Sequence, residues 1–252
     1  MQSKPRRPAG SLVIPAYNEA GRLPKTLQEI AAYAHRHPTW SLEVIVVDDG
    51  STDETSEVVH ATRQLPFRLS LLQHPTNRGK GAAVRTGLSA ARGSWVLILD
   101  ADGSLPVGEL DRFLPVLKDA PIVISSKYLA PSLDTARQSW DRTIVSRTGN
   151  WLVRHLFGLP YADTQCGFKL LRAEAARAIA PYLTIPRWAF DIELLVIARE
   201  LGLAVRELPI AWTNTDDSRV SALPAAWTSV GELLIIWQQL KRGTYAPAHL
   251  TR

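Results

Sequence analysis

The stretch at 95–106, WVLILDADGSLP, runs from five consecutive apolar residues directly into two carboxylates, Asp100 and Asp102. A short apolar run of this kind predicts a strand buried on both faces, as in a parallel sheet. Ligands bind parallel α/β sheets at the carboxyl ends of the strands, so the two acids mark a candidate site. Residues two apart on an extended chain share a face, which would aim both carboxylates at one point.

Two interpretations of this Asp-x-Asp remain open at this level. Carboxylate oxygens suit Mg²⁺ or Mn²⁺, which bind through one or two carboxylates and substrate phosphates. The alternative is an ordinary turn, since aspartate and glycine both favour turns. A second acidic strand end, Asp48 and Asp49 in DDGS, favours the metal interpretation, because adjacent strand ends would share one crevice.

Strands and helices alternate outward from this stretch through the first half of the chain. The apolar runs predict strands at 11–17, 42–49, 68–74, 94–100 and 121–126. Helical patterns begin at Leu23 and cover 51–64 and 79–93, with Asp49, Ser51 or Thr52 expected to cap the second helix. This order predicts an α/β fold, a Rossmann-like, mostly parallel twisted sheet with helices on both faces.

The second half is less regular. Helices are predicted at 143–158 and 189–202, and a late strand at 204–213. No internal repeat or clear linker interrupts the chain, so a single domain is expected.

Composition narrows the class of protein. The chain has 252 residues, 46% of them apolar and 21% charged, with a net charge of +5 and a pI near 9.5. A mildly basic chain suits anionic ligands or an anionic membrane surface. No Lys/Arg-rich run or aromatic RNA-binding signature is present, so no nucleic-acid partner is expected. Cys166 is the only cysteine, which excludes an internal disulfide and favours a reducing compartment.

The glycines of NRGKGAAVRTG, at 77–87, suggest a phosphate loop but do not follow its spacing. A nucleotide-triphosphatase loop needs Gly-x-x-x-x-Gly-Lys-Ser/Thr, which is absent here. Lys80 can therefore be a phosphate contact or the solvated start of a helix.

Several motifs together resemble a known family. VIPAYNE at 13–19, VVDDGSTD at 46–53, NRGKGAAVRTG and LDADG at 99–103 occur in the order and spacing of the inverting family-two glycosyltransferases of GT-A fold. DTQCGFKLLR at 163–172 and WAFDIELL at 188–195 are similar to the branch that makes polyprenyl-phosphate sugars, especially the dolichyl-phosphate β-glucosyltransferases. Dolichyl-phosphate mannose synthases are related to this branch.

The resemblance implies a nucleotide-sugar site and a metal site. Asp100 and Asp102 would hold Mg²⁺ or Mn²⁺ and the diphosphate, with Ser104 where some relatives have a third ligand. The residues expected to contact the nucleotide sugar are Pro15, Tyr17, Glu19, Val47, Asp49, Lys80, Asp100, Ala101, Asp102 and Arg219.

The resemblance also implies an acceptor-phosphate site made of Lys127, Arg142 and Ser146. One helix turn separates Arg142 from Ser146, which places them on the same face. Lys127 stands where relatives have arginine, so it keeps the charge but gives up bidentate geometry.

The implied reaction is inverting transfer of a sugar, glucose favoured, from a nucleotide-diphosphate sugar to a polyprenyl or dolichyl phosphate. GDP-mannose or another donor, or a glycan hydroxyl acceptor, remains the alternative. A phosphate acceptor is already ionised at neutral pH and needs no general base, whereas a hydroxyl would. Asp191 is the candidate base, with Glu193 also available; both can instead be structural.

Apolar and basic residues of the second half suggest a membrane surface. Trp151, Leu152, Leu156 and Phe157 lie among basic residues, and Trp227, Val230, Leu234 and Trp237 recur at helical spacing. Packing of both stripes against the core is the alternative. No run reaches the roughly 18 apolar residues of a spanning helix, so an integral membrane protein is not expected and peripheral attachment stays open. The expected location is the cytoplasm, on the cytoplasmic face of a membrane.

The expected organisation follows from these assignments. A single GT-A domain at 11–240 is expected between a flexible tail at 1–10 and a tail at 241–252. Within it, the expected parts are a nucleotide-binding half at about 11–125, an acceptor half at about 126–220 and an interfacial helix at 223–241. The sequence leaves the oligomeric state open.

Overall fold

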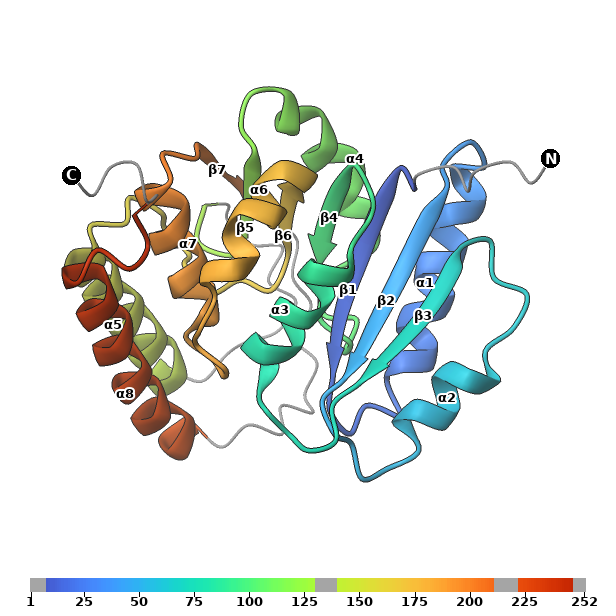
Figure 1. Cartoon of the computed structure of the whole chain (residues 1–252), viewed down its shortest axis with the longest axis horizontal. Helices are drawn as coiled ribbons and strands as arrows, with labels where there is room; N and C mark the ends of the chain where they lie inside the picture. The colour runs from blue at the N-terminus through green and yellow to red at the C-terminus, as the bar shows by residue number, and fades with distance from the viewer. Residues whose placement is uncertain (1–7, 130–139, 211–221, 247–252) are drawn as a thin grey trace.

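The structure is a computed structural model that describes residues 8–129, 140–210 and 222–246, and the side chains at 140–146 and 222–229 lie outside that description. Its centre is a seven-stranded sheet in the order β3-β2-β1-β4-β6-β5-β7 (Figure 1). The strands are β1 (Gly10–Ala16), β2 (Leu42–Asp48), β3 (Arg68–Gln73), β4 (Trp95–Ile98), β5 (Ile122–Ser126), β6 (Lys169–Arg172) and β7 (Val205–Pro209).

Six of these strands run in the same direction, and β6 is antiparallel to both of its neighbours, β4 and β5. Every residue of β1, β2, β4 and β5 is buried, which explains why their sequences are nearly continuous apolar runs. The predicted Rossmann-like, mostly parallel sheet is confirmed.

Helices cover both faces of the sheet. On one face, α1 (Leu23–Arg36) and α4 (Leu110–Phe113) pack on side chains such as Leu12 and Leu97. On the other, α3 (Lys80–Ala90), α5 (Trp140–Phe157), α6 (Ala173–Ile179), α7 (Phe190–Glu200) and α8 (Ala222–Lys241) share a second core cluster. The remaining elements are α2 (Thr55–Ala61) and the 3₁₀ turns η1 (Val107–Glu109), η2 (Leu114–Lys118) and η3 (Ala180–Tyr182).

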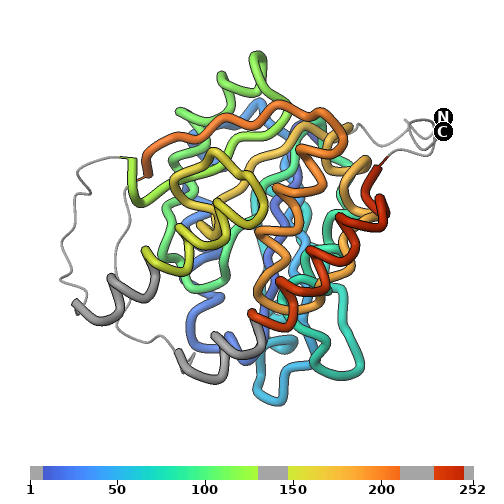
Figure 2. The backbone as a smooth tube through the Cα atoms, turned by 90° about the vertical axis from the view of Figure 1, so that its left-hand side faces the viewer, coloured from blue at the N-terminus to red at the C-terminus, as the bar shows by residue number. Residues whose placement is uncertain are grey.

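Two helices, α5 and α8, form an outer flank of the molecule (Figures 1 and 2). Each sends apolar side chains inward, Phe157 from α5 and Ile236 from α8, into the same core cluster. Among the described residues, no helix combines the length and apolar character needed to cross a membrane.

Several sequence expectations need correction. The fourth strand ends at Ile98, and Ala101 and Asp102 lie in a turn, so the two acids are not on an extended chain. The second helix begins at Thr55 rather than 51, and no side chain caps it. The strand β6 and the helix α6 were not predicted, because both are short and their apolar residues show no clear helical or strand periodicity.

The chain also stays structured past the expected boundary at 241. Tyr245 is fully buried, and its hydroxyl donates a hydrogen bond of 2.9 Å to Glu193 Oε1. This segment belongs to the core that α7 and α8 share.

Candidate functional site

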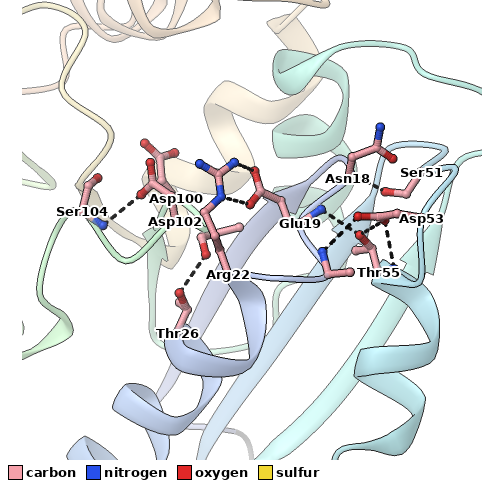
Figure 3. Close-up of polar contacts among 12 residues, drawn as sticks. Asn18, Glu19, Arg22, Thr26, Ser51, Asp53, Thr55, Asp100, Asp102 and Ser104 are labelled. Carbon is pink, nitrogen blue, oxygen red and sulfur yellow. Dashed lines mark hydrogen bonds and ion pairs between the residues drawn. The ribbon is translucent and has the colours of Figure 1, made fainter. Parts of the chain in front are cut away.

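The loops that follow β1 and β2 are joined by hydrogen bonds into one rim at the carboxyl edge of the sheet (Figure 3). Asn18 takes up a left-handed φ of 55°, its N–H donates to Ser51 Oγ at 2.9 Å, and its Oδ1 accepts from Thr52 N at 2.8 Å. A left-handed conformation is tolerated by asparagine better than by most residues. The YNE motif after β1 and the GSTD motif after β2 are therefore joined to each other by hydrogen bonds.

A second set of contacts completes this rim. The N–H of Glu19 donates to Thr55 Oγ1 at 2.8 Å, and the N–H of Ala20 donates to Asp53 Oδ2 at 3.2 Å. Asp53 also accepts from its own loop, through Thr55 N at 3.0 Å. Burial raises the pKa of Asp53, but hydrogen bonds from the Thr55 hydroxyl, Ala20 N and Thr55 N together hold that pKa below the usual value.

The predicted nucleotide contacts lie on or beneath this rim. Tyr17 is 45% exposed, so its ring is free to meet a ligand. Glu19 is instead paired with Arg22, which donates to both of its carboxylate oxygens at 2.6 and 2.5 Å. Pro15 and Val47 are register partners in β1 and β2, and both are buried. A nucleotide contact for each of these residues stays a prediction.

The Asp49 carboxylate fastens the loop that leads into α3. It accepts from His74 Nδ1 at 2.6 Å, from Arg78 N at 3.0 Å and from Gly79 N at 2.6 Å. Asp49 is buried and does not cap α2. Gly79 has a φ of +102°, a conformation open to glycine, which lets the loop turn into the helix.

At the start of α3, Lys80 forms an ion pair with Asp100, with 2.6 Å between Nζ and Oδ1. Burial alone would lower the pKa of Lys80, but Asp100, Asp191 and, more weakly, Asp102 raise it well above its ordinary value. Conversely, burial alone would raise the pKa of Asp100. The positive charge of Lys80, and more weakly those of Lys169 and Lys127, hold the pKa of Asp100 below its ordinary value. Both partners are therefore charged at neutral pH.

The Asp-Ala-Asp loop is held in place by its neighbours. Ser104 N donates to Asp102 Oδ1 at 2.9 Å, and Thr26 Oγ1 donates to the carbonyl of buried Ala101 at 2.7 Å (Figure 3). Gly167 lies against Asp100, since a Cβ at that position would stand 2.2 Å from Asp100 Oδ2.

These residues fit a magnesium or manganese ion. In the described part of the chain, no three His, Cys, Asp or Glu side chains gather as a metal cluster, and a metal at this loop would have the carboxylates of Asp100 and Asp102 as its protein ligands. A hard cation bound through one or two carboxylates, with phosphates and waters completing its shell, suits such a loop. The hydrogen bond to Asp102 Oδ1 leaves Oδ2 of that residue for this role, whereas the Asp100 carboxylate is already paired with Lys80.

Two lysine–aspartate contacts that sequence reasoning missed involve lysines that also act on Asp100. Lys169 of β6 is fully buried and its Nζ donates to Asp191 Oδ1 at 2.6 Å. Lys127 lies near Asp163, whose Oδ2 accepts from Lys127 N at 3.2 Å. Burial alone would lower the pKa of Lys127, but Asp163 raises it above the ordinary value. The one available signal was a lysine inside the apolar run GFKLL, since a buried lysine needs a partner.

The two acids weighed as general bases differ in their surroundings. Glu193 accepts from Thr184 N, Thr184 Oγ1, Ile185 N and Tyr245 Oη, so it organises the loop before α7. Asp191 lies in the charged cluster, where burial raises its pKa and Lys169 and Lys80 oppose that rise. A chemical role for Asp191 stays a prediction.

The remaining predicted residues lie partly outside the described residues. The backbone of α5 places Arg142 and Ser146 one helix turn apart as expected, but their side chains are outside the description. Arg219 lies outside the described residues altogether.

The structure thus carries an Asp-x-Asp loop and lysine side chains at the carboxyl edge of a mostly parallel sheet, the part of an α/β sheet where ligands bind. The chain belongs to glycosyl transferase family 2, whose family model matches residues 11–179. It is 35% identical to the dolichyl-phosphate beta-glucosyltransferase of Drosophila melanogaster, covering 96% of this chain and 78% of that protein. It is 34% identical to the human protein of the same name, covering 89% and 73%.

Solved structures confirm the GT-A fold. Glucosyl-3-phosphoglycerate synthase from Mycobacterium tuberculosis, in complex with phosphoglyceric acid, has a TM-score of 0.66 at 19% identity, covering 91% of this chain and 79% of that one. The same enzyme in complex with Mn²⁺ and UDP-glucose has a TM-score of 0.64 at 20% identity, covering 91% and 79%.

Proposed function

We propose that this chain transfers glucose from UDP-glucose to a polyprenyl or dolichyl phosphate, with inversion and with Mg²⁺ or Mn²⁺. The observation that carries the proposal is the charge arrangement at the carboxyl edge of the sheet. Two carboxylates on one loop stand beside Lys80, with Lys127 and Lys169 close enough to lower the pKa of Asp100. Carboxylates and ammonium groups together suit a reaction between two phosphate-bearing substrates.

The donor half of this arrangement is Asp100, Asp102 and Lys80. A divalent ion held by the two carboxylates would act as a Lewis acid that neutralises the departing diphosphate. Lys80 is charged and lies at the same point, so its ammonium group can pair with a diphosphate oxygen when a donor is bound. The rim of the β1 and β2 loops lies along the same edge (Figure 3), and it would receive the nucleoside together with the exposed Tyr17, which directly follows β1.

The acceptor half is Lys127, with Arg142 and Ser146 on α5 as the further expected contacts. In the proposed step, an acceptor phosphate oxygen forms a bond to the anomeric carbon, and the bond from that carbon to the diphosphate oxygen breaks. UDP leaves with the electron pair, and single displacement turns an α-linked donor into a β-linked product. Because the nucleophile is already an anion, no proton needs to be removed.

This scheme gives Asp191 a positioning role. Its Oδ1 accepts a hydrogen bond from a buried lysine and the residue is itself buried, so it is poorly placed to take a proton from a bulky acceptor. Its negative charge raises the pKa of Lys80 and so helps to keep that lysine charged at the centre of the site.

The proposal includes attachment to the cytoplasmic face of a membrane, because the acceptor is a lipid. An apolar flank on α5 and α8 supports it: the exposed side chains there are Trp151, Leu152, Leu156, Val230, Leu234, Ile235 and Trp237. Basic groups lie on the same helices, with exposed Arg147 on α5 and Lys241 next to Trp237 on α8. Helices with aromatic and basic side chains of this kind suit a lipid interface.

One residue of the expected membrane contact is excluded. Phe157 is fully buried in the core, so the α5 contribution is limited to its exposed neighbours. Trp227 lies where side chains are outside the description.

The test is a donor panel against one polyprenyl phosphate, with Mn²⁺, with Mg²⁺ and with a chelator. Turnover of UDP-glucose to a β-linked lipid product, lost with chelator and in Asp102→Asn, is expected. Preference for GDP-mannose would reassign the donor, and transfer to a sugar hydroxyl instead of the lipid would reassign the acceptor. An α-linked product would reject single displacement.

A further inference from the structure

Trp188 is an exposed aromatic side chain beside the charged centre of the site. The Lys80 Nζ lies 5.9 Å from the centre of the Trp188 ring and 5.8 Å from that of Phe190. Phe190 is buried, whereas Trp188 is 39% exposed. The Lys80 ammonium group thus lies near two aromatic rings, one buried in the core and one partly exposed to solvent.

The backbone that carries Trp188 is fixed by a buried carboxylate from α8. Glu232 accepts three consecutive backbone hydrogen bonds, from Arg187 N at 3.0 Å, Trp188 N at 3.1 Å and Ala189 N at 2.9 Å. Glu232 is buried and interrupts the apolar run VGELLIIW. Burying a carboxylate is costly unless its oxygens are satisfied, so the three contacts explain why an acid stands there.

The start of α3 holds the same loop from the other side. The N–H groups of Gly81 and Ala82 donate to the carbonyls of Arg187 and Pro186 at 3.2 and 3.0 Å. Lys80 and Trp188 therefore belong to two segments that are tied together by their main chains. These helix N–H groups are consequently not free to bind a phosphate.

We propose that the Trp188 ring is a platform for the sugar that is transferred, and that Glu232 is a positioning residue for it. The inference rests on the proposed function, because it takes the ligand to be a nucleotide-diphosphate sugar. In the proposed complex the diphosphate lies at Lys80 and Asp100 and the sugar is bonded to that diphosphate, so the sugar would lie within reach of a ring that is near Lys80. The C–H face of a pyranose complements an aromatic ring, and the sugar hydroxyls meet the neighbouring charged groups.

The decisive experiment compares UDP-glucose with UDP, both with Mn²⁺, by calorimetry on the wild type, Trp188→Ala and Trp188→Phe. In Trp188→Ala, the affinity for UDP-glucose falls about tenfold or more, equivalent to about 1.4 kcal/mol, while that for UDP changes less than about twofold. Trp188→Phe keeps an aromatic face and recovers most of the loss. UDP serves as the internal control in each variant.

If Trp188→Ala loses the same affinity for UDP-glucose and for UDP, or loses affinity for neither, the proposal that the ring binds the sugar is wrong. A change confined to the KM of the lipid acceptor also overturns it and would assign the ring to the acceptor. If the wild type binds no nucleotide sugar, the proposed function fails instead, so the two failures are distinguishable.

The positioning role of Glu232 is tested by asking whether the effect of changing Glu232 requires the Trp188 ring. Glu232→Gln replaces one acceptor oxygen with a donor, and we expect it to lower the ratio of UDP-glucose to UDP affinity at least threefold, which is about 0.65 kcal/mol. Adding the same change to Trp188→Ala leaves that ratio unchanged, because the two residues act as a unit. Additive effects would overturn the positioning role, and the two Trp188 variants decide the platform even if Glu232→Gln fails to fold.

Discussion

Lys80 and Asp100 form an ion pair of 2.6 Å at the point where the fourth strand opens into the Asp-Ala-Asp loop. The pair links two motifs that are separated along the chain, the glycine-rich segment before α3 and the acidic strand end. It keeps both groups charged, since each opposes the effect of burial on the other's pKa. A divalent ion on Asp100 would have to share this carboxylate with the lysine.

Lys80→Met is expected to increase the affinity for Mn²⁺ alone by about tenfold and to reduce glucosyl transfer. Removing a positive charge beside Asp100 favours a cation there, and tenfold corresponds to about 1.4 kcal/mol. The variant also loses a partner for the diphosphate. Mn²⁺ binding followed by electron paramagnetic resonance, without donor, gives the first quantity.

Lys25→Met is a suitable control, because Lys25 is exposed on α1 and pairs only loosely with Glu29 at 3.9 Å. Its Mn²⁺ affinity should match that of the wild type. An unchanged affinity in Lys80→Met would show that Asp100 does not hold the metal.

Gly167→Ala is expected to reduce transfer by at least about tenfold and to destabilise the fold by about 1–3 kcal/mol, because the inserted methyl group overpacks the site. The new methyl group would lie 2.2 Å from Asp100 Oδ2 and 2.8 Å from its Cγ, so the carboxylate must move. Displacing a metal ligand affects the ion and the diphosphate together. Steady-state kinetics and urea unfolding of the same preparation give the two numbers.

Gly149→Ala provides the matched control, since a Cβ at that helical position meets nothing within 4 Å. It should leave transfer unchanged and stabilise the helix by up to about 1 kcal/mol. Wild-type activity in Gly167→Ala would mean that Asp100 tolerates displacement and is not a close ligand.

The sequence predicted those parts of the fold that local patterns determine. The runs that became β1, β2 and β5 are apolar because both faces of a parallel strand are buried, and that signal is visible in one dimension. The strand β6 has only four residues and pairs antiparallel with β4 and β5, and the whole of helix α5 separates it in sequence from the nearer of the two, β5. Such a pairing is a property of the tertiary fold.

The residues of the candidate site were likewise predicted only where a local sequence pattern identifies them. Asp100 and Asp102 were found because acids directly after a buried strand have no packing explanation. Lys169 and Asp191 were not joined beforehand, since 22 residues separate them and only the folded chain brings Nζ and Oδ1 to 2.6 Å. Phe157 was assigned to the surface because helical spacing identifies a stripe of apolar side chains but not which of them face the core.

Asp53→Asn is expected to lower the melting temperature near neutral pH by about 2–4 °C, with a difference that disappears in acid. The change removes an acceptor for Ala20 N, and a hydrogen bond of about 1 kcal/mol corresponds to such a shift in a chain of this size. Because the pKa of Asp53 is lower in the folded state, its contribution is present above the unfolded value of about 3.9. It is lost as the pH falls through the folded pKa.

Calorimetric melting of both proteins from pH 6 down to the acid limit of folding tests this sign. The gap between them should be constant above pH of about 4.5 and narrow below about 3.9. A gap that widens in acid would show that Asp53 is not stabilised in its ionised form and that the rim is held by other contacts.

Replacing Trp151, Leu152 and Leu156 with serine is expected to weaken binding to anionic vesicles about tenfold or more without lowering stability. These side chains are exposed on α5, so the change removes apolar surface that would enter the lipid while breaking no core contact. Leu156 is 44% exposed and the next residue, Phe157, is 1% exposed, which supplies the contrasting variant on the same helix. Phe157→Ala should destabilise the fold by about 3–5 kcal/mol through a core cavity. Co-sedimentation with vesicles and urea unfolding separate the two effects, and undiminished vesicle binding in the triple variant would remove α5 from the membrane contact.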